Sequence, residues 1–227
     1  MKSDRPSKAI IHSLYDDPMS GEQIEERSFE IIDREAPEHN YSPDQWEVVR
    51  RMIHTTADFA LVRDVRFSMD AVDAGVAGLR SGAPVYVDSN MIKSGLSLAR
   101  LRQVCPKYAP GSVICHVADE DVVEAARKNG LPRSLFAVRK AKALLPGGIA
   151  VFGNAPVALM ELNRLIMEEG IKPALVVAMP VGFVHVVESK EELMSLDVPF
   201  IAIAGRRGGS PLAVSTLHAL CSVAERG

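Results

Sequence analysis

Several residue types and patterns are scarce in this sequence, and each absence excludes a class of protein. The three cysteines are an odd number without a Cys-x-x-Cys pair. They indicate neither a disulfide framework nor a zinc site, so buried free thiols are expected. No His-x-x-x-His or Glu-x-x-His pattern occurs, and no metal site is predicted. No apolar run approaches a membrane span, and the polar N-terminus does not resemble a signal peptide. We therefore expect a cytoplasmic protein that has no membrane partner.

An excess of positive charge is also lacking. The chain has 26 Lys and Arg against 29 Asp and Glu, a net charge of -3, whereas a nucleic-acid binder normally presents a basic face. No nucleic-acid partner is expected, although a local basic pocket is compatible with this balance. A length of 227 residues with 47% hydrophobic residues suffices for one core. We expect a single domain over residues 1–227, in which residues 1–20 form a flexible arm.

Helical patterns precede the first expected strand. One covers Glu22–Glu35. A second opens at Ser42-Pro43-Asp44-Gln45, where Ser42 can cap the first turn and Gln45 can reach back to it. Five apolar residues of this second pattern recur at helical spacing and are expected to be buried: Trp46, Val49, Ile53, Ala57 and Ala60. A third helix is expected over Met69–Ser81.

Short apolar runs, each followed by a turn and a helical pattern, make up the rest of the chain. The runs are Pro84–Val87, Ser112–Val117, Ile149–Phe152, Ala174–Ala178 and Phe200–Ala204, and the main helical patterns are Asp119–Asn129, Ser134–Leu144, Ala155–Glu169 and Pro211–Glu225. Runs that are apolar throughout are typical of parallel strands covered on both faces. The sequence therefore predicts an α/β fold: a doubly wound, mostly parallel sheet of about five strands with helices on both faces, preceded by an N-terminal helical segment.

Ligands of such sheets bind at the carboxyl ends of the strands. The segments expected there are Asp88–Gly95, Val117–Asp121, Gly153–Pro156, Met179–Glu188 and Gly205–Ser210. Asn154 can act as the N-cap of the helix that follows it. The apolar Met179–Phe183 stretch is either the wall of a pocket or a place where loops pack closely. Lys93, Arg133 and Ser134 are polar candidates that could equally be ordinary surface residues.

His54 is the histidine with the most charged surroundings. Arg50, Arg51 and Asp58 lie three or four positions away and are expected on the same helix face. Histidine titrates near ~6.5 and can donate or accept a proton around neutrality. Two interpretations follow from this pattern: a solvated surface residue, or a general acid.

Gly205-Arg206-Arg207-Gly208-Gly209-Ser210 lies between an expected strand and an expected helix. Glycines let backbone amides face an anion, and arginines bind carboxylate or phosphate in a bidentate manner. A tight turn with solvated arginines explains the string equally well. It matches neither the Walker loop nor the Rossmann glycine pattern, so nucleotide binding has no specific support.

Six strings, in the same order along the chain, resemble one family. They are Ile24–Ile32, Arg51–Phe59, Phe152–Pro156, Met179–Val184, Glu188–Lys190 and Gly205–Ser210. Together they are similar to the precorrin-8X and cobalt-precorrin-8 methylmutases, over about Ile24 to Leu220.

The resemblance implies an isomerase of cobalamin biosynthesis that is a homodimer, needs no cofactor and acts on a carboxylated tetrapyrrole. The reaction it implies is a [1,5] shift of a methyl group from C-11 to C-12, which gives hydrogenobyrinate or cobyrinate. The family's histidine corresponds to His54, which would protonate a ring nitrogen and later take the proton back. By similarity, Ser28, Arg51, Arg133 and Ser134 would contact the substrate. Lys93, Asn154, Gly182 and Arg206, from the expected strand-end segments, complete the candidate contacts.

One string departs from the family. His185-Val186-Val187 stands where the family usually has small residues before Glu-Ser-Lys, and a bulkier loop could alter the edge of the pocket. Two alternatives to the isomerase stay open: a non-catalytic tetrapyrrole carrier on the same scaffold, and a protein that binds a phosphorylated metabolite through Gly205–Ser210. The sequence does not decide whether the substrate already holds cobalt.

Overall fold

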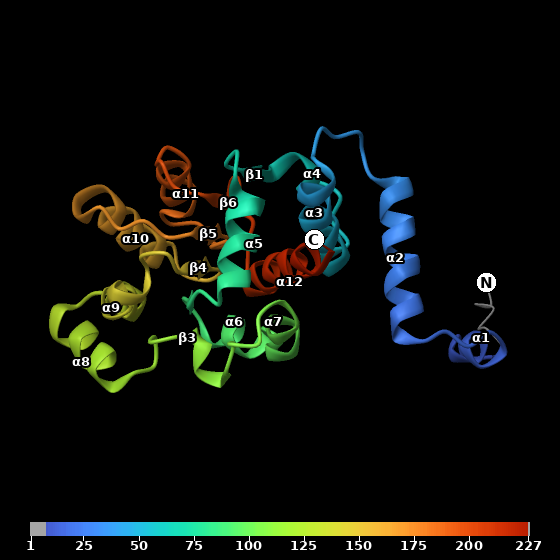
Figure 1. Cartoon of the computed structure of the whole chain (residues 1–227), viewed down its shortest axis with the longest axis horizontal. Coiled ribbons are helices and arrows are strands. Elements are labelled where there is room, and N and C mark those ends of the chain that lie inside the picture. The colour runs from blue at the N-terminus through green and yellow to red at the C-terminus, as the bar shows by residue number, and fades with distance from the viewer. Residues whose placement is uncertain (1–7, 227) are drawn as a thin grey trace, which may run out of the picture. The chain divides into compact units, whose positions relative to one another are not determined.

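The computed structural model describes residues 8–226 and divides into two compact units, one ending at Ala36 and the other beginning at Pro37 (Figure 1). The first unit contains α1 (Ile11–Asp16) and α2 (Gly21–Glu35). A reciprocal cap begins α2: Ser20 Oγ accepts from the Gln23 amide at 3.2 Å, and the Ser20 amide donates to Gln23 Oε1 at 2.8 Å. The expected N-terminal helical segment is confirmed.

The arm predicted over residues 1–20 contains α1, and its first seven residues lie outside the described residues. The single-domain organisation stays a prediction.

The second unit holds one sheet of six strands in the order β1-β6-β5-β4-β2-β3. The strands are β1 (Val65–Phe67), β2 (Val85–Val87), β3 (Val113–Ile114), β4 (Ile149–Phe152), β5 (Leu175–Ala178) and β6 (Phe200–Ile203). All neighbouring pairs are parallel except β1 and β6. The mostly parallel α/β sheet predicted from the sequence is confirmed, although β3 is much shorter than the expected run.

β1 is the strand that the sequence pattern did not predict. It has three residues, and Arg66 at its centre is exposed, so no apolar run marks it. It pairs antiparallel with β6 at the edge of the sheet, with Val65 opposite Ile203 and Phe67 opposite Ile201. Short edge strands carrying a charged residue are common because they discourage pairing with other chains.

The helices of the second unit include those expected and several short ones at strand ends. They are α3 (Pro43–Thr56), α4 (Leu61–Asp64), α5 (Ala71–Ser81), α6 (Asn90–Gly95), α7 (Leu98–Val104), α8 (Glu120–Asn129), α9 (Arg133–Lys140), α10 (Pro156–Glu169), α11 (Val186–Met194) and α12 (Ser210–Arg226). The 3₁₀ turn Lys142–Leu144 follows α9. The expected helices agree with this assignment to within a few residues, whereas α4, α6, α7 and α11 were not predicted.

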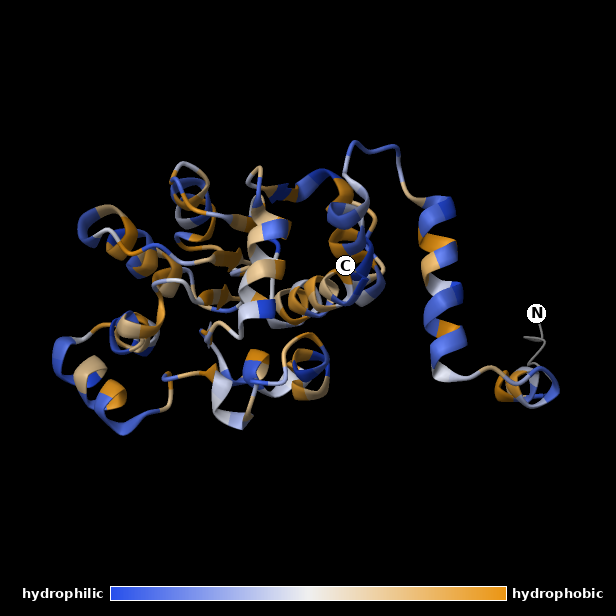
Figure 2. Ribbon diagram, viewed as in Figure 1, coloured by the Kyte–Doolittle hydropathy of each residue, from blue (hydrophilic) through white to orange (hydrophobic). Residues whose placement is uncertain are grey.

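Alternate strand residues face two helical layers, as period-two side-chain alternation requires. On one face, Tyr86, Phe152 and Val176 share a core with residues of α9, α10 and α11. On the other face, α5 packs so closely that a Cβ at Gly75 would lie 2.9 Å from the Leu175 side chain. The strands are accordingly among the orange, apolar segments of Figure 2. Helices therefore cover both faces, as predicted.

α3 begins with the capping box that the sequence indicates: Ser42 Oγ accepts from the Gln45 amide at 3.2 Å, and the Ser42 amide donates to Gln45 Oε1 at 3.1 Å. Val49 and Ile53 are buried as expected. The expected stripe is wrong at its end, because Ala57 and Ala60 are exposed. The helix stops at Thr56 because Ala57 adopts the left-handed conformation with φ 53°.

Replacing Ala57 by glycine is expected to raise the free energy of unfolding by about 1 kcal/mol, because an L-residue with a Cβ is strained in the left-handed region. Urea titration measures the change. The matched control is Ala77→Gly, inside α5, where the same substitution should lower stability by about 1 kcal/mol. Equal effects of the two substitutions would contradict the assigned helix end.

In residues 8–226, no helix has both the length and the apolar character that crossing a membrane requires. All three cysteines are free, with Cys105 and Cys221 buried and Cys115 half-buried. The expected buried thiols are confirmed for two of the three.

Candidate active site

The loops after four parallel strands meet at the carboxyl edge of the sheet. Asp88 follows β2, Gly153 follows β4, Met179 follows β5 and Ala204 follows β6. Hydrogen bonds join these loops directly: the Gly209 amide donates to Met179 O at 2.8 Å, and the Ser89 and Ser210 hydroxyls lie 3.1 Å apart. This edge is where an open parallel sheet binds its ligand, and it carries several of the candidate residues.

Asp88 organises the turn after β4. Its buried carboxylate accepts hydrogen bonds from the amides of Gly153 at 3.1 Å, Asn154 at 2.9 Å and Ala155 at 2.7 Å. Burial raises the pKa of Asp88 above its ordinary value, and these amide hydrogen bonds offset only part of that rise. The predicted N-cap role of Asn154 is wrong, since α10 has its N-cap at Ala155 without a side-chain cap. The carboxylate of Asp88 binds the amides of the turn that leads into α10, and the Asn154 side chain is exposed.

The loop after β6 fits closely against the loop after β5. A Cβ at Gly208 would lie 2.2 Å from Met179 O and 2.6 Å from Pro180 O, so only glycine allows this approach. The Gly182 amide donates to Arg206 O at 3.4 Å. Of the two interpretations of the Met179–Phe183 stretch, close loop packing holds for Met179 and Pro180, which are buried.

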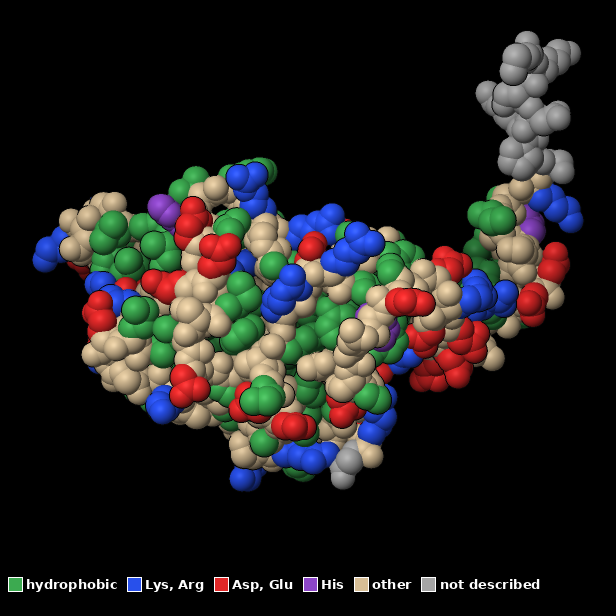
Figure 3. Space-filling model, turned by 90° about the horizontal axis from the view of Figure 1, so that it is seen from above, with side chains coloured by type: hydrophobic (Ala, Val, Ile, Leu, Met, Phe, Trp, Pro, Cys, Tyr) green, Lys and Arg blue, Asp and Glu red, His purple; other side chains and the backbone are tan. Residues whose placement is uncertain are grey.

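The tip of the β5 loop is apolar and exposed. Phe183 is 85% exposed and Val184 is 72% exposed. The Arg206 guanidinium lies 5.6 Å from the centre of the Phe183 ring. In the departing string, Val186 is buried, Val187 is half-buried, and His185, with φ 57°, is exposed next to this tip. On the face seen in Figure 3, blue arginine and lysine side chains stand among green apolar ones.

His54 lies in the last turn of α3 and is exposed, with the half-buried Arg51 one turn earlier. The expected neighbour Asp58 is not on their helix face, because the helix ends two residues before it. Instead, Asp58 Oδ2 pairs with Arg207 at 3.0 Å, and Arg207 also reaches Asp64 Oδ2 at 3.3 Å. This ion pair joins the end of the His54 helix to the loop after β6.

The other candidates lie on separate elements. Lys93 is on α6, directly after β2, rather than on the loop predicted for it, and is exposed. Arg133 and Ser134 open α9; Arg133 is exposed and Ser134 is buried. Ser28 is on α2 of the first unit, where its hydroxyl donates to Ile24 O at 2.7 Å.

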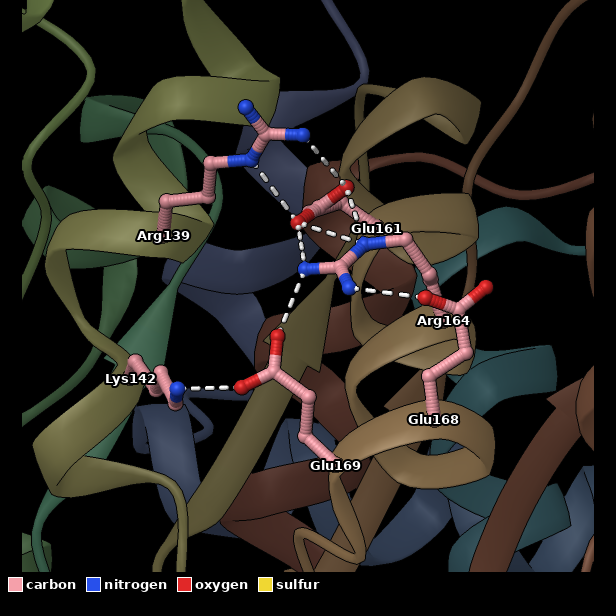
Figure 4. Close-up of polar contacts among 6 residues, drawn as sticks. All are labelled: Arg139, Lys142, Glu161, Arg164, Glu168 and Glu169. Atoms are coloured by element: carbon pink, nitrogen blue, oxygen red, sulfur yellow. Dashed lines mark hydrogen bonds and ion pairs between the residues drawn. The ribbon is translucent and has the colours of Figure 1, made fainter.

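A network of ion pairs fixes α9, the helix that carries Arg133 and Ser134, to α10 (Figure 4). Its members are Arg139, Lys142, Glu161, Arg164, Glu168 and Glu169. The Glu161 side chain is only 4% exposed and accepts from Arg139 at 2.9 Å and Arg164 at 2.7 Å. Burial raises the pKa of Glu161, but the hydrogen bonds from Arg164 and Arg139 outweigh it and hold the pKa below its ordinary 4.5.

Replacing Glu161 by glutamine is expected to lower the free energy of unfolding by about 1–2 kcal/mol at neutral pH, because charge-assisted hydrogen bonds are lost. A carboxylate with a lowered pKa stabilises the fold above its unfolded pKa, and this contribution disappears on acidification. The difference between wild type and variant should therefore shrink below about pH 4.5. Denaturant titrations across pH test this. Glu168→Gln, at a 65% exposed position, should change stability by less than about 0.5 kcal/mol; an equal loss there would contradict the account.

Two residues and one ion pair that organise this edge were not predicted from the sequence. Asp88 follows a buried strand directly, a position that could have marked it. Lys190, described below, stands in the Glu-Ser-Lys string but was not singled out. The pairing of Arg207 with Asp58 joins residues far apart in the sequence, and no local pattern indicates it. Among residues 8–226, no group of three or more His, Cys, Asp or Glu side chains is arranged to hold a metal ion.

Comparison with known proteins gives one consistent result. The family model for Precorrin-8X methylmutase matches residues 23–223. A cobalt-precorrin-8 methylmutase of Leptospira interrogans is 43% identical over 215 residues, covering 91% of this chain and 95% of the relative. That of Priestia megaterium is also 43% identical, covering 91% and 89%. A crystal structure of the precorrin-8X methylmutase of Thermus thermophilus matches with a TM-score of 0.83 and 46% identity, covering 91% and 98%. With its sheet, its strand-end loops and nearly its whole length matched, this chain belongs to the precorrin-8X methylmutase family of isomerases.

Proposed function

We propose that this chain moves a methyl group from C-11 to C-12 of precorrin-8X or cobalt-precorrin-8, giving hydrogenobyrinate or cobyrinate, with His54 as the general acid and base. Family membership supports the reaction class. The observation that carries the assignment of His54 is the ion pair between Arg207 and Asp58. It links the end of the His54 helix to the loops at the carboxyl edge of the sheet, where a ligand is expected.

The chemistry of that edge suits a tetrapyrrole. The exposed apolar tip of the β5 loop, with Phe183 and Val184, offers a surface for a flat apolar ring. Arg206, Lys93 and Arg133 are exposed cations that can bind the acetate and propionate arms around such a ring. Arg51, Ser134, Asn154 and Gly182 are proposed as further substrate contacts. Ser28, in the first unit, stays a prediction that its replacement by alanine would test.

Besides the rearrangement, the proposed reaction needs one proton, which is donated and afterwards returned. The protonated His54 donates to a ring nitrogen, and the positive charge draws electrons from the ring. The bond from the methyl group to C-11 then breaks as the bond to C-12 forms, and the neutral imidazole takes the proton back. A positioned acid contributes about 10²–10⁴-fold in rate, and orientation by the loops supplies the remainder.

A turnover experiment distinguishes this enzyme from a carrier. Substrate and product are isomers of equal mass, so the conversion is followed by absorbance and chromatography. With a hundredfold excess of cobalt-precorrin-8 or precorrin-8X, product is expected to exceed the enzyme concentration many times. A spectral change that stops at one pigment per chain would favour the carrier. The faster of the two substrates identifies the metal state of the ring.

The homodimer and the cytoplasmic location expected from the sequence stay predictions. Light scattering of the purified protein tests the first: a mass near twice the 24.6 kDa of the chain is expected, and a mass equal to one chain would contradict it.

A further inference from the structure

Lys190 is a cation with no exposed surface. It lies on α11, and its side chain has 0% exposure. Its ammonium donates to Gly205 O at 2.9 Å and to Arg207 O at 2.6 Å. Burial lowers its pKa to about 8. Burying an ammonium is unfavourable, and an apolar side chain of similar volume would fill the space without that cost. Packing alone therefore does not explain a lysine here.

The two hydrogen bonds of Lys190 set the peptide orientation in the loop after β6. In a planar trans peptide, the carbonyl of one residue and the amide of the next point in opposite directions. With the carbonyls of Gly205 and Arg207 turned toward Lys190, the amides of Arg206 and Gly208 point to the other side of the loop. Lys190 thus fixes the orientation of two peptide groups, Gly205–Arg206 and Arg207–Gly208.

This loop in turn holds the end of α3. Arg207 Nη1 lies 3.0 Å from Oδ2 of Asp58, which is two residues beyond the last residue of the helix. The same guanidinium reaches Asp64, whose own carbonyl accepts from the Ala204 amide at 2.8 Å. Contacts from α11 to the loop, and from the loop to Asp58, therefore form a continuous path that ends four residues from His54.

We propose that Lys190 is a positioning residue for His54: by clamping the Gly205 and Arg207 carbonyls it holds Arg207 on Asp58 and so fixes the last turn of α3. The inference rests on the proposed role of His54 as the acid. It assigns Lys190 no contact with substrate. Its loss acts by letting the loop and the helix end move, and a misplacement of about 1 Å can cost ~10²-fold in rate.

Lys190→Met removes the ammonium and leaves an unbranched apolar side chain that is one atom shorter. In the folded variant, amide hydrogen exchange of the 205–210 peptide should become at least about tenfold faster, while that of β4 stays unchanged. We expect kcat on cobalt-precorrin-8 to fall by about 10–100-fold, with KM changed less than about threefold. Lys190→Gln, which keeps an N–H donor, should recover part of the loss. Lys172→Met, at an exposed lysine, should behave as wild type.

A double-mutant cycle with His54→Asn separates positioning from a structural role. If Lys190 acts through His54, adding Lys190→Met to His54→Asn should lower the residual rate by less than about threefold. Equal losses in both backgrounds, wild-type kcat in folded Lys190→Met, or unchanged loop exchange would each overturn the inference. If Lys190→Met does not fold, the same cycle with Lys190→Gln decides. Full activity of His54→Asn alone would instead refute the proposed acid, and the exchange data would still report on the clamp.

Discussion

Replacing His54 by asparagine is expected to lower kcat by about 10²–10⁴-fold, the contribution of a positioned general acid. Asparagine keeps a polar side chain of similar size but cannot transfer the proton. Because His54 is exposed at the end of its helix, the fold should not change. Binding of cobalt-precorrin-8, followed by the absorbance of the pigment, should persist with a dissociation constant within about threefold of wild type.

His12→Asn is the matched control, since His12 is an exposed histidine on α1. It should leave kcat unchanged. Wild-type turnover by His54→Asn would remove His54 from the reaction. A loss of pigment binding equal to the loss of turnover would make it a binding residue rather than an acid.

Replacing Gly208 by alanine is expected to lower the free energy of unfolding by about 3 kcal/mol, because the added methyl group would overlap backbone that cannot easily give way. The new Cβ would lie 2.2 Å from Met179 O and 2.6 Å from Pro180 O. The loop after β6 must then move away from the loop after β5. Because both loops lie at the candidate active site, the activity of the folded fraction should also fall. Urea titration and kcat at a temperature where the variant is folded measure the two effects.

Gly111→Ala makes the same substitution where no atom lies within 4 Å of the new Cβ. It should change stability by less than about 0.5 kcal/mol. If Gly208→Ala were equally harmless, the close contact between the β5 and β6 loops would not exist in solution.

Much of the fold follows from local patterns in the sequence. The capping box at Ser42 and Gln45 marks the start of α3, and the apolar run Ile149–Phe152 coincides with β4. Both signals act within a few residues, so pattern reading detects them. The end of α3 is different: Ala57 has no sequence signature of a helix end, and the helical pattern continues past it. Because the helix was expected to continue, Asp58 was wrongly predicted to lie on the same helix face as His54.

The candidate site is less predictable because its organisation depends on contacts between distant segments. Asp88 accepts hydrogen bonds from the amides of a turn 65 to 67 residues further along the chain. No pattern within a few residues of Asn154 indicates this contact. Lys190 lies in α11, a helix that no apolar pattern in the sequence predicts. Its burial follows from the packing of the folded chain and could not be predicted from its charge. The resemblance to the family makes His54 the candidate acid, whereas the path from Lys190 to the end of α3 could be found only from the structure.

The most direct test of the account follows one methyl group. Cobalt-precorrin-8 or precorrin-8X carrying a ¹³C label in the C-11 methyl group is incubated with a small amount of the enzyme, and its carbon spectrum is recorded over time. With wild-type protein, we expect the labelled resonance to disappear from C-11 and appear at C-12 in all of the substrate, and with His54→Asn we expect the same change to be about 10²–10⁴-fold slower. A label that stays at C-11 with wild-type protein on both substrates would contradict the proposed reaction.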